Sequence, residues 1–160
     1  MINDKIEKLL NNIANRVNKL LTTYLDINDE IFKPSIRKTI PIPGIFKKIN
    51  YHSNYSKLSD IETDLRTDLN DLNTLVHVFK EFTIEFQFIG IFLKYCEALL
   101  DTIYSLKTIC FKMREKIDGN SKYPYTEYDS DVEDYNKLVE RYVSIGSTVN
   151  QYYQEIISKT

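Results

Sequence analysis

The sequence predicts an all-α protein, a helical bundle of about four principal helices with a long loop after the first. The chain of 160 residues has only four glycines and four prolines, too few for an architecture of many strands and turns. Residues 59–117 contain no proline and one glycine, and their apolar side chains recur at steps of three and four, from Leu72 through Phe86 to Ile103. This spacing follows one face of an α-helix, whereas the faces of a strand repeat every two residues.

Length and composition indicate one domain over residues 1–160. Hydrophobic residues make up 42% of the chain and charged residues 28%, which is ordinary for a globular protein able to bury a core. The formal net charge of −2 gives no overall attraction for phosphates. We therefore expect no nucleic-acid partner.

A first helix is predicted over residues 3–25, with Asn3 as its N-cap. An isolated helix of this length is marginal in water, so we expect other helices to cover its apolar face. That face consists of Ile6, Leu9, Leu10, Ile13, Val17, Leu20, Leu21 and Tyr24.

A long basic loop is predicted over residues 26–57, because the helical pattern stops and three of the four prolines fall there. Residues 32–58 include no acidic residue. Loops of this length are more often functional or disordered than simple connections. Several apolar residues lead us to expect that part of the loop packs on the bundle. Its basic candidates for partner binding are Lys33, Arg37, Lys38, Lys47 and Lys48.

The second and third helices are predicted over residues 59–82 and 85–117. As one helix the segment would be about 90 Å long, out of scale with its neighbours. Thr83 and the alternating apolar residues around it mark the expected break, with a single long helix as the alternative. Residues 82–100 are apolar on nearly all sides, so we expect the third helix to be the central one. The regular steps are also typical of coiled-coil packing.

The last helix is predicted over residues 130–158, with Gly146 marking a close helix–helix contact. Ser130 to Glu133, like Ser59 to Glu62, has the sequence of a capping box, which predicts a helix start at each serine. Before this helix, residues 118–129 form an acidic, tyrosine-rich loop. Its candidates for partner binding are Tyr123, Tyr125 and Tyr128, because tyrosine is enriched at protein interfaces.

The positions of the two charged loops depend on whether residues 59–117 form two helices or one. In an up-down-up-down bundle they lie at the same end and attract each other. With one continuous long helix they lie at opposite ends, which favours head-to-tail self-association. The choice depends on the break near Thr83.

The cysteines and the N-terminus suggest a cytoplasmic protein. Cys96 and Cys110 are fourteen residues apart on one predicted helix, about 21 Å along its axis, which excludes a disulfide between them. No uninterrupted apolar run follows Met1, so no signal peptide is expected. The most apolar window, residues 82–100, contains Glu85, Lys94 and Glu97, which disfavours a membrane span.

The sequence offers little for catalysis. It has two histidines, His52 and His77, and no Gly-rich phosphate loop, nucleophile elbow or Cys-x-x-Cys motif. We expect no enzyme, no cofactor and no metal ion. The predicted function is that of a non-enzymatic protein-interaction module, a subunit, adaptor or inhibitor of another protein, with self-association as a further option. The alternative is a membrane-acting bundle that binds anionic lipid through the basic loop and the apolar central helix.

Overall fold

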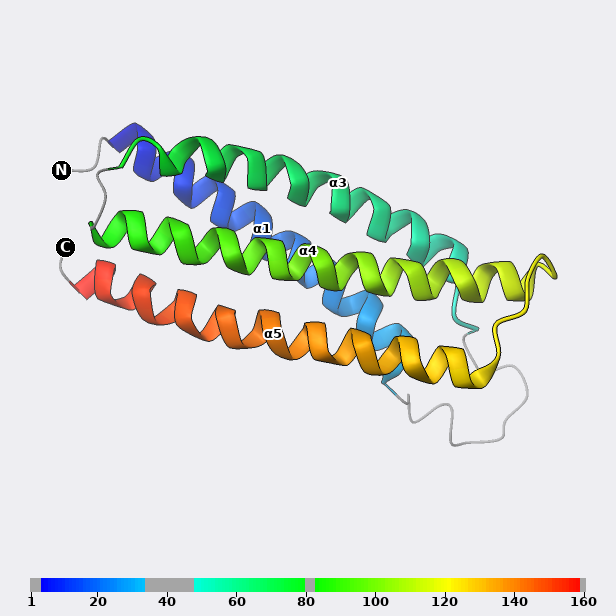
Figure 1. Cartoon of the computed structure of the whole chain (residues 1–160). Coiled ribbons are helices and arrows are strands. Elements are labelled where there is room, and N and C mark those ends of the chain that lie inside the picture. The colour runs from blue at the N-terminus through cyan, green and yellow to red at the C-terminus, as the bar shows by residue number, and fades with distance from the viewer. Residues whose placement is uncertain (1–3, 34–47, 80–82, 159–160) are drawn as a thin grey trace.

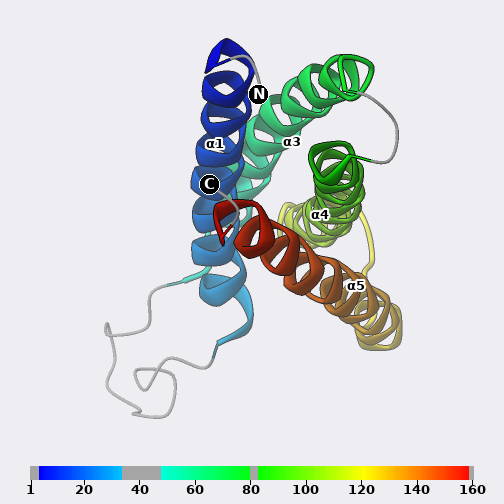
Figure 2. The ribbon, with the colours of Figure 1, turned by 90° about the vertical axis from the view of Figure 1, so that its left-hand side faces the viewer.

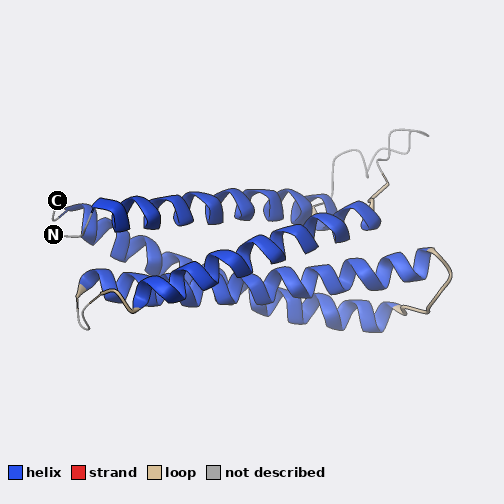
Figure 3. Ribbon diagram, turned by 90° about the horizontal axis from the view of Figure 1, so that it is seen from above, coloured by secondary structure: helices blue, strands red, loops and turns tan. Residues whose placement is uncertain are grey.

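The computed structural model describes residues 4–33, 48–79 and 83–158, and four helices account for most of them. These are α1 (Asp4–Phe32), α3 (Tyr51–Val76), α4 (Ile84–Ile117) and α5 (Tyr125–Ser158). They run alternately up and down (Figure 1). The end of α1, the start of α3, the end of α4 and the start of α5 lie at one end of the bundle (Figure 1). Among the described residues, Figure 3 shows helices and loops and no strand. This is the predicted all-α four-helix bundle.

The break between the second and third helices is confirmed at Thr83. The Thr83 hydroxyl caps α4 by accepting a hydrogen bond of 3.2 Å from the Phe86 amide. α3 has already ended at Val76, where the Val78 amide turns back to the Leu75 carbonyl at 3.0 Å. The alternative of one continuous helix over residues 59–117 is therefore wrong.

Two predicted helix ends are wrong because buried contacts extend the helices, and the predicted end of the second helix at residue 82 is wrong because α3 stops earlier, at Val76. α1 continues past residue 25 to Phe32, since Ile27 and Ile31 prolong its buried face. α3 starts at Tyr51 instead of residue 59, with the Asn50 side chain accepting a 3.0 Å hydrogen bond from the Ser53 amide. The long loop thus shrinks from residues 26–57 to residues 33–50. The predicted N-cap Asn3 lies outside the described residues.

Both predicted capping boxes lie inside helices. The Ser59 hydroxyl donates to the Tyr55 carbonyl at 3.0 Å, the interior bond that serine makes within a helix. α5 starts at Tyr125 instead of Ser130, and the Pro124 carbonyl accepts from the amides of Glu127 and Tyr128 at 3.1 Å. The predicted acidic loop over residues 118–129 is therefore shorter, and its last part belongs to α5.

The core lies around α4, as the apolar pattern predicts. α4 packs along both α3 and α5, while α1 packs mainly against α3. The end-on view shows α1 beside α3 and α5 beside α4 (Figure 2). Side chains from α4 at the centre of this core are fully buried, among them Ile89, Cys96, Leu99, Ile103 and Leu106. The backbones of α1 and α5 do not approach each other closely, so one edge of the bundle stays open.

Candidate functional site

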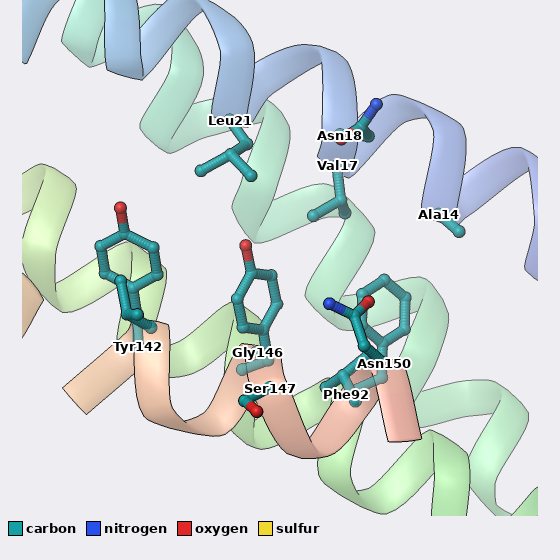
Figure 4. A pocket seen from close by; sticks show the side chains of 12 residues that line it. Ala14, Val17, Asn18, Leu21, Phe92, Tyr142, Gly146, Ser147 and Asn150 are labelled. Atoms are coloured by element: carbon teal, nitrogen blue, oxygen red, sulfur yellow. The ribbon is translucent and has the colours of Figure 1, made fainter. Parts of the chain in front are cut away.

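The open edge between α1 and α5 forms a groove with a volume of about 560 Å³. Side chains from both helices face each other across it, with α4 beneath (Figure 4). The groove is lined by Ala14, Val17, Asn18, Leu21, Phe92, Tyr95, Tyr142, Val143, Gly146, Ser147, Val149 and Asn150.

The floor of the groove is apolar and aromatic. Phe92 and Tyr142 are buried, and the ring of Tyr95 stacks on Phe92 at 6.3 Å and meets Tyr142 edge-on at 6.2 Å. Gly146 makes room for this ring, because a Cβ atom there would lie 3.1 Å from Tyr95 Cε2. The close contact predicted at Gly146 is therefore between α5 and a side chain of α4.

The rim of the groove is polar but carries no charge. Residues 142–154 of α5 include no Asp, Glu, Lys or Arg, although charged residues make up 28% of the whole chain. Across the groove, α1 presents exposed amides and a hydroxyl at helical spacing. The uncharged polar side chains that line the groove are Asn18 of α1 and Ser147 and Asn150 of α5. The same two helices carry further exposed, uncharged polar side chains, namely Asn11, Asn15 and Thr22 on α1, and Ser144, Gln151 and Gln154 on α5.

A buried tyrosine network connects α1 to α5 next to the groove. Tyr135 of α5 donates a hydrogen bond of 2.7 Å to Asn28 Oδ1 of α1, so its oxygen accepts from the Tyr24 hydroxyl. Tyr24 also meets the ring of Tyr142 edge-on at 6.1 Å. Burial raises the pKa of Tyr24 and of Tyr135, and each lies close to further tyrosines. Both hydroxyls therefore stay protonated and bridge the two helices.

The three tyrosines predicted as a contact surface have different surroundings. Tyr123 is only 2% exposed, and its hydroxyl donates to Asp131 Oδ2 at 2.6 Å. Tyr128 is half-buried in the first turns of α5 and meets the Tyr123 ring edge-on at 5.9 Å. Tyr125 begins α5 and is 75% exposed. The expectation that all three stand in a loop is wrong, since two of them are helical.

Of the five basic candidates, the structure describes two. Lys33 is exposed and pairs with Asp29 at 2.5 Å, and Lys48 is exposed. Arg37, Lys38 and Lys47 lie outside the described residues. Neither Lys33 nor Lys48 lines the groove, whose lining comes from the middle of α1, from α4 and from the second half of α5.

The helix ends that the two connections join lie at the same end of the bundle, as an up-down-up-down topology requires (Figure 1). At this end His52 Nε2, in the first turn of α3, lies 3.2 Å from Oδ1 of Asp118, the C-cap residue of α4, and both side chains are exposed. An exposed pair of this kind contributes little to stability. Glu127 and Asp131, both in the first turns of α5, form ion pairs with Lys112 of α4 instead, at 2.8 and 2.7 Å.

A second, charged hollow of about 520 Å³ lies between α1 and α3. Arg16 reaches from α1 to Asp68 Oδ1 at 2.7 Å and to Asp71 Oδ2 at 3.1 Å. Asp68 is buried, and burial raises the pKa of its carboxyl despite the opposing effect of Arg16. These contacts join α1 to α3, so the hollow is lined by an ion-pair network with a structural role.

Other predicted features have plain positions in the fold. Cys96 and Cys110 are free and buried on the continuous helix α4, and burial raises the pKa of the Cys110 thiol to about 12. His77 is exposed at the end of α3.

The described residues contain no group of three or more His, Cys, Asp or Glu that could hold a metal ion. Within the same residues, no helix combines the length and apolar character needed to cross a bilayer.

No family model, curated protein or solved structure matches this chain. The groove was missed in the sequence, because the apolar residues that line it also fit a closed core. One signal was present: the uncharged stretch of α5 over residues 142–154, which follows a half rich in charge. An exposed helix face without charge is unusual at a solvated surface and typical of the centre of an interface.

Proposed function

We propose that this protein is a protein-interaction module that binds an α-helix of its partner in the groove between α1 and α5. The observation that carries the proposal is the combination of an apolar floor and uncharged polar lining residues along an edge where the backbones of α1 and α5 stay apart. In this role the protein acts as a subunit, adaptor or inhibitor of another protein.

The shape of the groove favours a helical partner. Its two walls are helices, and an inserted helix would supply the neighbour that α1 and α5 lack along this edge. An amphipathic helix would place apolar side chains at positions i, i+3, i+4 and i+7 against the floor. Val143, 55% exposed on one wall, would lose its contact with water in such a complex.

The chemistry of the rim favours a protein surface as the ligand. The centres of protein interfaces are depleted in charge, because a charge buried without a partner loses its hydration. Amide and hydroxyl side chains such as Asn18, Ser147 and Asn150 can donate and accept hydrogen bonds from the polar flanks of a bound helix.

The competing hypothesis of a membrane-acting bundle draws no support from the contacts of the described residues. The apolar side chains of α4 that it requires at the lipid surface are packed between α3 and α5. Co-sedimentation with vesicles of anionic lipid tests it directly, because a helix-binding module of this kind is not expected to pellet with them.

The proposal is tested by placing the photo-crosslinking amino acid benzoylphenylalanine at Asn18 or Ser147, one on each wall of the groove. The matched controls are Asn70 on α3 and Asn136 on the charged half of α5, both exposed. After irradiation in native lysate, mass spectrometry should find one partner helix joined at both groove positions and at neither control. Equal crosslinking from the controls, or none from the groove, would contradict the proposal.

A further inference from the structure

The exposed ridge of α5 beside the groove is itself suited to pack against a copy of the same ridge. We define the α5 ridge as Val143, Ser147, Asn150 and Gln154, which follow one another at steps of four, three and four on one helix face. All four are exposed, and the first three also line the groove.

We infer that the helix bound in the groove is α5 of a second copy of this chain, packed antiparallel across a two-fold axis. The inference rests on the proposed function, since it names the partner of the same groove. Each copy would place its α5 ridge against the α1–α5 edge of the other, as an isologous interface requires.

The first argument is charge. Near a two-fold axis every side chain lies close to its own copy, so a charged residue there would repel itself. The α5 ridge has no charge, and neither do the other residues from 142 to 154. Amide and hydroxyl groups carry both donors and acceptors, so two identical uncharged faces can form hydrogen bonds with each other.

The second argument is the match between the two ends of the ridge. In an antiparallel pair centred between Ser147 and Asn150, the Ser147 hydroxyl of one copy faces the Asn150 amide of the other. Val143 then faces the aliphatic part of Gln154. A polar pair thus meets near the axis, and an apolar contact closes each side of it.

The third argument fixes the direction. The first half of α5 is strongly acidic, with Glu127, Asp129, Asp131, Glu133 and Asp134. A parallel pair would bring these carboxylates of the two copies together. An antiparallel pair that overlaps through the second halves places them at opposite ends of the dimer. The small net charge of −2 adds little repulsion between the copies at long range.

The test is the oligomeric state of the full chain and of two variants, Ser147→Lys and Ser147→Glu, by sedimentation velocity over a wide concentration range. The wild type should sediment as a dimer of the 18.9 kDa chain. Each variant alone should dimerise about a hundredfold more weakly, because like charges meet near the axis. An equal mixture of the two should recover the dimer, because lysine and glutamate then lie close to each other across the axis and attract.

Asn136→Lys is the matched control, since it adds the same charge to an exposed position two turns before Val143. Its dimer should be unchanged, and equal thermal transitions by circular dichroism would show that all variants fold. A wild type that is monomeric throughout, a dimer that resists both charges, or a mixture that stays monomeric would overturn the inference. A crosslink from Ser147 to a different protein would overturn it too, yet leave the proposed function standing.

Discussion

The hydroxyl of Tyr135 on α5 donates a hydrogen bond of 2.7 Å to Asn28 Oδ1 on α1, across an edge where the two backbones stay apart. Because its proton is committed to Asn28, the Tyr135 oxygen accepts from Tyr24, also on α1. Phe32 stacks on the Tyr135 ring at 5.4 Å. Long aromatic side chains therefore connect α1 to α5 at one end of the edge, and the groove begins at Tyr142, which meets the Tyr24 ring edge-on.

Tyr135→Phe should destabilise the protein by about 1–3 kcal/mol, because it leaves the Tyr24 hydroxyl and Asn28 Oδ1 without their shared partner. Urea unfolding followed by circular dichroism measures the loss. Tyr24→Phe is the matched control, since it removes one hydrogen bond and leaves the bond from Tyr135 to Asn28 in place, at a cost of about 1 kcal/mol. An equal or larger loss for Tyr24→Phe would contradict the assigned direction of the hydrogen bonds.

The two glycines inside helices should respond differently to alanine. Gly90 has open space around the position of a Cβ atom, so Gly90→Ala should stabilise α4 by about 0.5–1 kcal/mol through its helix propensity. Gly146→Ala should gain clearly less, because its Cβ would lie 3.1 Å from the Tyr95 ring, which is held between Phe92 and Tyr142. Thermal unfolding of both variants shows whether Gly90→Ala raises the melting temperature more than Gly146→Ala does. Equal stabilisation would mean that Tyr95 moves freely.

The buried Asp68 should make stability depend on pH in the direction opposite to a typical paired carboxylate. Its folded pKa is raised, so the folded state holds a proton that the unfolded state has released, and stability falls as pH rises through this window. Asp68→Asn removes this dependence. The free energy of unfolding of the variant should therefore rise relative to that of the wild type as pH increases from the unfolded pKa of Asp68 through its folded pKa. Urea unfolding at a series of pH values measures this difference.

Glu62 is the control for this experiment, because its shift has the opposite sign. Burial acts to raise its pKa, but Lys107 and Arg66 together outweigh burial and lower it. Glu62 thus contributes stability above its unfolded pKa that is lost as pH falls through its folded pKa. The free energy of unfolding of Glu62→Gln should therefore fall relative to that of the wild type as pH rises. Parallel pH profiles for the Asp68 and Glu62 variants would contradict the two assignments.

The two thiols should be protected from modification while the protein is folded. Cys96 and Cys110 are fully buried, and burial raises the pKa of each, so neither forms a thiolate near neutral pH. A thiol-reactive dye should label them at least about a hundredfold more slowly than a cysteine introduced by Ser121→Cys in the exposed turn after α4. Rapid labelling of the wild type would show that the core around α4 opens easily.

The sequence by itself determined the class of the fold, because helical periodicity is a local property. Steps of three and four identify the buried face of each helix, and Thr83 identifies the break, since a hydroxyl that caps a helix acts on an amide three residues away. The break in turn gave the up-down-up-down order and placed both connections at one end.

The helix ends and the candidate site depended on tertiary structure. Ser59 has the sequence of a helix start, yet burial of Tyr51 and Asn54 extends α3 past it. Tyr123 reads as an exposed loop residue, yet Asp131 and Tyr128 enclose it. No local pattern records which neighbour covers a helix face. Only the packed bundle shows that α1 lies against α3 and leaves its edge with α5 open, because that choice rests on contacts between residues far apart in the chain.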